Sequence, residues 1–184
     1  MRTLHIVTAC GRFDRLKDVA ENIAKLTRSA MPGFAVRWHV AFQHPDQFDL
    51  CGARKMNEMV DLVPDEDWVW VLDDDNEMHV SFLYVLDQAF TLHPHKRAFV
   101  FSQNRWDILG PVLLAKPENM KVGGVDTAQV VFQKSLRGDL KLRLDSKVPD
   151  GILYAEMFQR TPEAFEFCTN FNVVNFNAAT RPKE

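Results

Sequence analysis

Residues 68–76 read WVWVLDDDN, an unbroken apolar run that is followed at once by three aspartates and an asparagine. A short apolar run rich in tryptophan and valine predicts a strand that is buried on both faces, as in a parallel sheet. In open α/β sheets, ligands bind just beyond the carboxyl ends of the strands. The three aspartates therefore stand where a ligand or metal site is expected.

The residues before this strand predict a βαβ unit. Residues 4–9 form an apolar run that reads as a buried strand, and residues 36–42 read as a second one. Between them, apolar residues recur at helical spacing after Asp14, until Pro32 and Gly33 end the helix. A βαβ start predicts an α/β fold with a mostly parallel central sheet flanked by helices.

The rest of the chain continues this pattern with less regular spacing. Residues 103–121 lack periodicity, which is typical of a functional loop. Leu140 to Leu144 alternates strictly between leucine and basic residues, which predicts a strand with one solvated face. The remaining predicted elements are helices over 52–63, 79–91 and 150–160 and strands over 98–101, 130–132 and 171–176.

Composition narrows the class of protein. The chain has 184 residues, 46% hydrophobic and 26% charged, which fits a single globular domain over residues 1–184 and excludes disorder. The net charge of -3 gives nucleic-acid binding no support. Cys10, Cys51 and Cys168 form no CxxC motif, which argues against a zinc cluster and favours a reducing compartment. Since no segment reads as a signal peptide or membrane span, we expect a cytoplasmic protein.

The aspartates after the strand predict a divalent-metal site. Adjacent carboxylates raise one another's pKa unless a cation compensates them, and hard cations take oxygen ligands. On an extended chain Asp73 and Asp75 face one site together, whereas Asp74 points elsewhere unless the chain turns there. Oxygen ligands favour Mg²⁺ or Mn²⁺ over zinc. The alternative is an acidic turn that caps the following helix.

At this point the sequence resembles the GT-A fold glycosyltransferases, especially the small family-2-like members. The resemblance covers most of the chain and rests on the βαβ start, on GARKMN at 52–57 and on the strand that ends in Asp-x-Asp. TACGRFDRL at 8–16 is similar to the family's nucleotide-side opening. Residues 123–129 resemble its acceptor-side strand, and residues 174–177 resemble its C-terminal strand. The resemblance implies a Rossmann-like GT-A domain.

The resemblance also implies roles for single residues. Asp73 and Asp75 match the metal-binding DxD motif, and Asp73 and Asp74 would contact the sugar-nucleotide. Asp150, in Pro149-Asp150-Gly151, matches the position of the catalytic base, with Glu156 and Asp126 as reserves. The other candidates are Thr8, Ala9 and Asp46 for the nucleotide base, Arg12, Arg15, Arg54 and Lys55 for the diphosphate, Asp126 and Gln129 for sugar hydroxyls, and Trp106 for stacking.

Two departures from the family pattern accompany this resemblance. Many members supply a late histidine as a further metal ligand, but this chain has no histidine after His95. The family's base often follows a glutamate, whereas Pro149 precedes Asp150 here. The resulting hypothesis is a metal-dependent, inverting transfer of a sugar from a nucleoside-diphosphate sugar, with UDP favoured, to a hydroxyl acceptor such as a saccharide.

Three alternatives stay open at the level of sequence. A strand followed by Asp-x-Asp also opens the haloacid-dehalogenase-like phosphatases, although a βαβ unit precedes it here. A GT-A-like domain that binds a nucleotide or carbohydrate without turnover is the second alternative. The third is a nucleic-acid base as acceptor, held by the basic residues Lys134, Arg137, Lys141 and Arg143, which otherwise form a solvated strand face.

Overall fold

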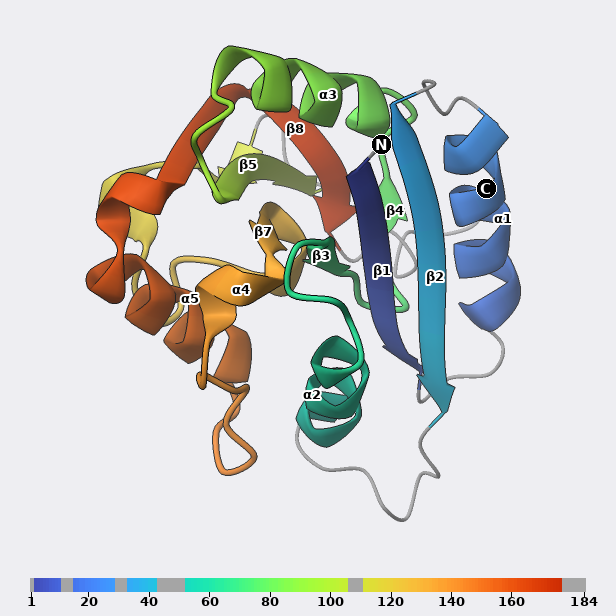
Figure 1. The fold of residues 1–184 in the computed structure, drawn as a ribbon. Helices are drawn as coiled ribbons and strands as arrows, with labels where there is room; N and C mark the ends of the chain where they lie inside the picture. Colours follow the sequence, from blue (N-terminus) through green and yellow to red (C-terminus); the bar gives the residue numbers. More distant parts are fainter. Residues whose placement is uncertain (1, 11–14, 29–32, 43–51, 106–110, 177–184) are drawn as a thin grey trace.

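The structure is a computed structural model that describes residues 2–10, 15–28, 33–42, 52–105 and 111–176. Its described strands form one sheet in the order β2-β1-β3-β7-β5-β8-β4, with β6 paired to β5 (Figure 1). The strands are β1 (Arg2–Cys10), β2 (Phe34–Phe42), β3 (Trp68–Val71), β4 (Glu77–Met78), β5 (Ala98–Arg105), β6 (Pro111–Leu113), β7 (Val130–Gln133) and β8 (Phe165–Phe176).

Most of the sheet runs in one direction. β1 pairs in parallel with β2 and with β3, and β5 pairs in parallel with β8. The antiparallel strand β7 lies between β3 and β5, so that β5 again runs the same way as β3. This arrangement confirms the predicted α/β fold with a mostly parallel sheet.

Helices cover both faces of the sheet. On one face Ile23 of α1 (Leu16–Arg28) and the apolar side of α3 (Phe82–Leu92) pack on Leu4, Ile6 and Trp70. On the other face α2 (Ala53–Asp61) and α5 (Pro149–Arg160) pack on Val7, Val69 and Val71 (Figure 1). The core residues divide between the two faces because successive side chains along a strand point to opposite sides of the sheet.

The stretch at 68–76 forms the predicted strand and then turns. Trp70 stacks on Phe82 with ring centroids 4.0 Å apart, and its Nε1 donates to the carbonyl of Ala128 at 2.9 Å. After Leu72 the backbone N–H of Asn76 donates to the carbonyl oxygen of Asp73 at 3.3 Å. The aspartates therefore lie on a turn, so the argument from alternation along an extended chain does not apply to them.

The predicted strand at Leu140–Leu144 is wrong. These residues have no regular secondary structure, although Leu140 and Leu142 are buried and Lys141 and Arg143 are exposed. The backbone of Leu142 pairs with a side chain: Asn57 accepts from the Leu142 N–H at 2.9 Å and donates to the Leu142 carbonyl at 2.8 Å. Alternation thus reports burial correctly, but a strand also needs a neighbouring backbone.

Three smaller expectations also change. Residues 103–105 continue β5 and 111–113 form β6, so parts of the predicted loop at 103–121 belong to the sheet. Residues 127–129 form a 3₁₀ turn instead of the acceptor-side strand. The short strand β4 precedes α3, which begins at Phe82. Within the described residues no helix is long and apolar enough to cross a membrane.

Candidate functional site

Three aspartates from distant parts of the chain line one cavity of about 220 Å³. Asp73 follows β3, Asp126 precedes the turn into β7, and Asp150 lies in the first turn of α5. The cavity lies at the carboxyl end of β3, where α/β sheets bind ligands. Its other lining residues are Met56, Thr127, Leu142, Lys147, Val148 and Pro149.

Thr127 links two of these carboxylates. Its hydroxyl donates to Asp73 Oδ2 at 2.9 Å and lies 3.4 Å from Asp126 Oδ1. Asp126 is the N-cap of the 3₁₀ turn at 127–129, since its Oδ1 accepts from the Ala128 N–H at 3.1 Å and Gln129 Oε1 accepts from the Asp126 N–H at 3.0 Å. This capping box fixes the turn that carries Asp126 and Thr127 to the cavity.

A close backbone contact brings Asp150 to the same place. Gly151 follows it in α5, and a Cβ on Gly151 would lie only 3.0 Å from the backbone nitrogen of Gly123. Glycine therefore allows the start of α5 to approach the segment that leads to Asp126. Asp150 is not the N-cap, which is Val148, but lies within the first helical turn.

The cavity carboxylates raise one another's pKa. Burial raises the pKa of Asp73 well above its usual range, and repulsion from Asp126 and Asp75 raises it further. Burial also raises the pKa of Asp126, against the opposing hydrogen bond from Gln103. Burial and repulsion from Asp126 raise the pKa of Asp150 to about 6. Such a cluster favours cations, hydroxyl donors or protons over anions.

Besides Thr127, the site includes two residues that the sequence did not indicate, Lys147 and Tyr154. Lys147 is the basic residue among those that line the cavity. Tyr154 is fully buried in α5, with its hydroxyl 3.4 Å from the carbonyl of Thr127, and burial together with the charge of Asp150 raises its pKa. No sequence signal marked Lys147, which follows an irregular segment, or Tyr154, which reads as an ordinary core residue.

The predicted DxD residues fall in different environments. Asp75 lies on the turn and repels the charges of both Asp73 and Asp126. Asp74 is buried on the same turn and does not line the cavity. Within the described residues no group of three or more His, Cys, Asp or Glu side chains could hold a metal ion by itself.

Several predicted nucleotide and sugar contacts lie elsewhere. Gln129 is buried, and its amide donates to the carbonyls of Phe101 at 2.9 Å and Leu113 at 3.3 Å, so it supports the fold instead of reaching a sugar. Thr8 is fully buried and accepts from Trp38 Nε1 at 3.2 Å. Ala9 packs against the core.

The remaining candidates lie outside the cavity or outside the described residues. Lys55 pairs with Glu58 at 2.7 Å on α2. Arg54 and Glu156 are exposed on α2 and α5, and Arg15 is half-buried before α1; none of the three lines the cavity. Arg12, Asp46 and Trp106 lie outside the residues that the structure describes.

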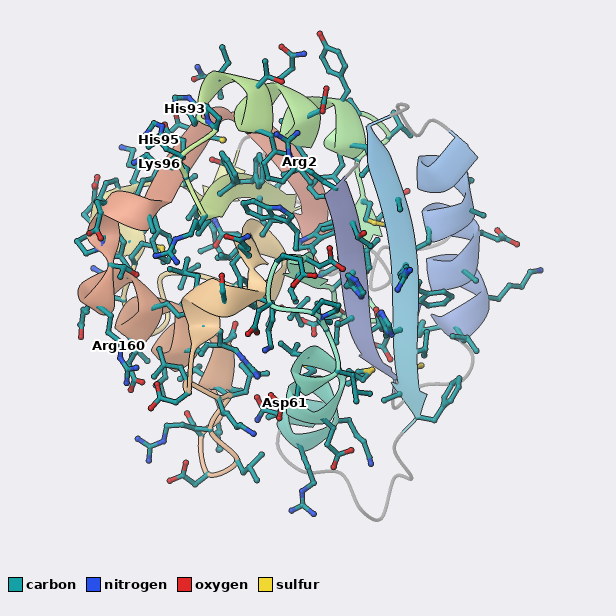
Figure 2. All side chains as sticks on the ribbon, viewed as in Figure 1. Arg2, Asp61, His93, His95, Lys96 and Arg160 are labelled. Carbon is teal, nitrogen blue, oxygen red and sulfur yellow. The ribbon has the colours of Figure 1, made fainter. Side chains whose placement is uncertain are left out.

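The proposed basic strip is neutralised by acidic partners. Asp61 lies at the end of α2 (Figure 2). Arg137 and Lys141 both pair with its carboxylate. Lys134 pairs with Asp65 at 3.0 Å, and the guanidinium of Arg143 bonds both carboxylate oxygens of Asp145. The strip therefore presents little unbalanced positive charge for a nucleic-acid backbone.

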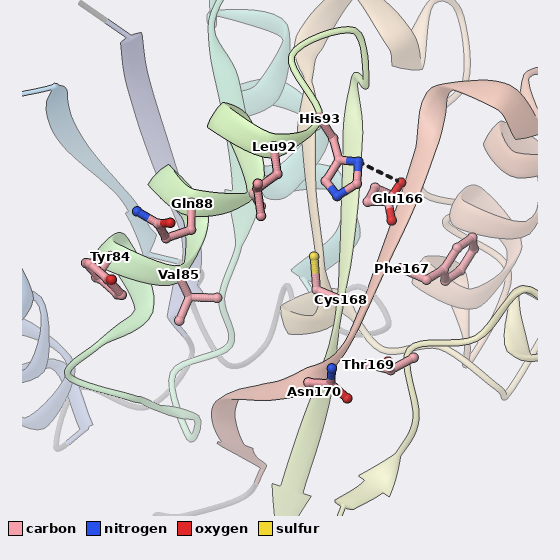
Figure 3. Close-up of a pocket in the computed structure, with 11 residues that line it drawn as sticks. Tyr84, Val85, Gln88, Leu92, His93, Glu166, Phe167, Cys168, Thr169 and Asn170 are labelled. Carbon is pink, nitrogen blue, oxygen red and sulfur yellow. Dashed lines mark ion pairs between the residues drawn. The ribbon is translucent and has the colours of Figure 1, made fainter.

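A second cavity of about 310 Å³ lies between α3 and β8 on the other face of the sheet (Figure 3). Its walls are largely apolar, with His93 Nδ1 3.5 Å from Glu166 Oε2 at one end. Burial raises the pKa of the Cys168 thiol in this groove to about 12, so the thiol is a poor nucleophile at neutral pH.

Comparison with known proteins places the fold. No protein-family model matches the chain, and no curated protein sequence matches it. The structure is similar to crystal structures of TarS from S. aureus: to TarS 1–349 with a TM-score of 0.69, 11% identity and 95% of this chain covered, and to TarS 1–349 in complex with UDP-GlcNAc with a TM-score of 0.69, 11% identity and 100% covered.

This likeness confirms the Rossmann-like GT-A fold that the sequence predicted, and at 11% identity it shows the fold alone. The chain spans 60% of TarS 1–349 and 62% of the chain crystallised with UDP-GlcNAc. A further TarS 1–349 structure, in complex with UDP, matches with a TM-score of 0.67.

Proposed function

We propose that this chain is a glycosyltransferase domain that moves a sugar from a nucleoside-diphosphate sugar, with UDP favoured, to a hydroxyl acceptor. The observation that carries the proposal is the meeting of Asp73 and Asp150 in one cavity at the carboxyl end of the sheet. The fold supports it, because similar TarS structures were crystallised with UDP and UDP-GlcNAc. The order of the strands favours this reaction over the phosphatase alternative, because Asp73 follows the third strand of the chain and not the first.

The donor chemistry of the cavity fits Mg²⁺ or Mn²⁺. Its acidic groups offer only oxygen ligands, and the charges of Asp73 and Asp75 repel each other without a compensating cation. Mg²⁺ is usually held by one or two carboxylates together with substrate phosphates, which suits a site without a three-residue cage. When bound, the ion would act as a Lewis acid for the leaving diphosphate. Lys147 supplies a second positive charge at the same cavity.

Asp150 is the proposed general base. Its pKa of about 6 leaves it mostly ionised at neutral pH while keeping it basic enough to accept a proton from a hydroxyl group. Asp150 would take the acceptor proton as that oxygen attacks the anomeric carbon, which makes inversion the expected outcome. Asp126 is the reserve within the cavity, and Glu156 is weaker because it is exposed outside it.

The acceptor is proposed to be a saccharide or another hydroxyl compound. The paired basic residues Lys134, Arg137, Lys141 and Arg143 weaken the case for nucleic acid. Apolar residues Met56, Leu142 and Val148 beside three carboxylates form a surface that suits a sugar ring, with its apolar face and its hydroxyl donors. A cytoplasmic location stays a prediction from composition.

The test is a thermal-shift titration with UDP and UDP-GlcNAc, each with and without Mn²⁺. A ligand at about 100 times its Kd adds roughly 2.7 kcal/mol to the free energy of unfolding. We expect a shift in the wild type that requires Mn²⁺ and is lost in Asp75→Ala. Asp145→Ala is the matched control, because Asp145 is exposed and its carboxylate pairs with Arg143, which does not line the cavity.

Three outcomes would contradict the proposal. Equal shifts in Asp75→Ala and in wild type would remove the acidic turn from the donor site. No shift with either nucleotide would remove the donor site altogether. Nucleotide binding without any hydrolysis or transfer of the sugar would favour the inert binding domain instead.

A further inference from the structure

Gln103 lies behind the cavity in an arrangement that packing alone does not explain. It is fully buried near the end of β5, and its Nε2 donates to Asp126 Oδ1 at 3.0 Å. Its Oε1 is buried and has no hydrogen-bond partner among the described residues. A buried acceptor without a partner lowers stability, and an apolar side chain of the same length would avoid that penalty. The Gln103 amide therefore holds Asp126 through its nitrogen, while its buried oxygen lowers the stability of the fold.

Among the described residues, the hydrogen bonds of the Asp126 carboxylate all involve one oxygen. Oδ1 accepts from Gln103 Nε2 and from the Ala128 N–H, and it lies 3.4 Å from the Thr127 hydroxyl. No described residue donates to Oδ2, while Asp126 itself lines the cavity. Because donors hold Oδ1 in place, the carboxylate has one anchored oxygen and one oxygen available to a ligand.

We infer that Gln103 is a positioning residue, and that it orients Asp126 so that Oδ2 accepts a hydrogen bond from a hydroxyl group of the donor sugar. This inference rests on the proposed function. A carboxylate oxygen repels the phosphates of a nucleotide but accepts strongly from a hydroxyl group. The pair Gln103–Asp126 therefore discriminates for the sugar and adds nothing to the binding of the nucleotide.

The test compares the Kd of UDP with that of UDP-GlcNAc by calorimetry in Mn²⁺. Asp126→Asn keeps an oxygen that can cap the turn but replaces the other oxygen by an amide nitrogen, and should weaken UDP-GlcNAc by about ten-fold to one-hundred-fold. Gln103→Met should weaken it by about three-fold to ten-fold, because Asp126 loses its anchor. UDP should bind Gln103→Met as it binds the wild type, because this change leaves the charge of Asp126 in place.

Two further readouts separate positioning from a merely structural role. Gln103→Met should unfold at the same temperature as wild type or higher, because the orphaned oxygen is gone. The double variant should bind UDP-GlcNAc no more weakly than Asp126→Asn alone, because both residues act on one contact. Gln133→Met is the matched control, since Gln133 is half-buried at the end of β7 and its amide reaches only the carbonyl of Glu66.

The outcomes are distinct. Weaker UDP-GlcNAc binding with unchanged UDP binding supports the inference. Equal weakening of both ligands, or of neither, overturns it and leaves the proposed function standing. Failure of the wild type to bind either ligand overturns the proposed function and the inference together.

Discussion

The molecule contains two clusters of polar side chains on the sheet, and they are built in opposite ways. The cavity cluster consists of Asp73, Asp126 and Asp150, which carry charges of the same sign. The second cluster joins the first three strands through His5 on β1, His39 on β2 and Asp67 just before β3. Both lie on the face of the sheet that also holds α2, since His5 and Val7 project to the same side of β1.

The residues of the histidine cluster hydrogen-bond to one another. Asp67 Oδ2 lies 3.0 Å from His5 Nε2, and His5 Nδ1 lies 2.8 Å from His39 Nε2. Since an ionised carboxylate only accepts, the chain of donors runs from His39 to His5 to Asp67. The two rings stack with 5.0 Å between centroids and 8° between planes.

This is the difference expected between a polar cluster that stabilises a fold and one that binds a ligand. In the histidine chain both ring nitrogens of the buried His5 have partners within the protein, His39 on one side and Asp67 on the other. In the cavity, three carboxylates of the same charge face one another, and among the described residues their donors are Thr127, Gln103 and backbone N–H groups. Carboxylates that repel one another and lack donors lower the stability of the fold. The cavity therefore favours a ligand that supplies hydrogen-bond donors or positive charge.

The largest expected effect is on turnover. Asp150→Asn should lower sugar transfer or hydrolysis by about 10² to 10⁴, because it removes the general base while keeping the size of the side chain. The Kd for UDP-GlcNAc should change little, since Asp150 acts on the acceptor. Turnover and Kd are measured on the same preparation. A variant that keeps its rate would move the role of base to Asp126.

The next effect concerns donor binding. Asp73→Asn should weaken Mn²⁺-dependent binding of UDP-GlcNAc by roughly ten-fold or more, because an amide is a poorer ligand for a hard cation than a carboxylate. The same change should raise the free energy of unfolding at pH 7, since Thr127 still has an acceptor and the repulsion from Asp126 is gone. Calorimetry and urea unfolding check the two directions. A loss of both binding and stability would make Asp73 a structural residue.

A substitution in the histidine chain should lower the free energy of unfolding, whereas Asp73→Asn should raise it. His5→Leu should lower the free energy of unfolding by about 2 kcal/mol, because it leaves Asp67 and His39 without their shared partner. His93→Leu is the control, as His93 is half-buried and lies 3.5 Å from Glu166, and it should change stability by less than about 0.5 kcal/mol. Urea unfolding compares the two. Binding of UDP-GlcNAc to folded His5→Leu should match wild type.

The last prediction concerns the pH dependence of stability. Because the folded-state pKa of Asp150 is about 6 against 3.8 unfolded, its contribution is present at low pH and is lost as pH rises through about 6. Burial lowers the pKa of His39 below 6.5, so its contribution is present above pH 6.5 and is lost as pH falls through the folded pKa.

Variants separate the two contributions. Asp150→Asn should be more stable than wild type at pH 8, by up to about 3 kcal/mol, and equal to it near pH 3.5. His39→Gln should flatten the loss of stability below pH 6.5. Unfolding titrations from pH 3.5 to 8 measure both, and a stability gain for Asp150→Asn that does not vary with pH would contradict the shifted pKa.

The sequence by itself predicted the strand at 68–71, the βαβ start and the helix that carries Asp150, because burial leaves a local pattern of apolar residues. It also marked Asp73 and Asp150 for chemistry. It placed a strand at Leu140–Leu144 that does not form and gave Gln129 a role in sugar binding that its buried hydrogen bonds do not support. Both errors concern partners that lie far away along the chain.

Only the tertiary structure decided which groups meet. Asp73, Asp126 and Asp150 are widely separated in sequence, and their convergence depends on the antiparallel insertion of β7 beside β3 and on the close approach that Gly151 allows. Lys147, Gln103 and Tyr154 join the site through the same packing and carry no local signal. Local patterns report whether a residue is buried, whereas pKa values and free ligand atoms depend on neighbours that only the folded chain brings together.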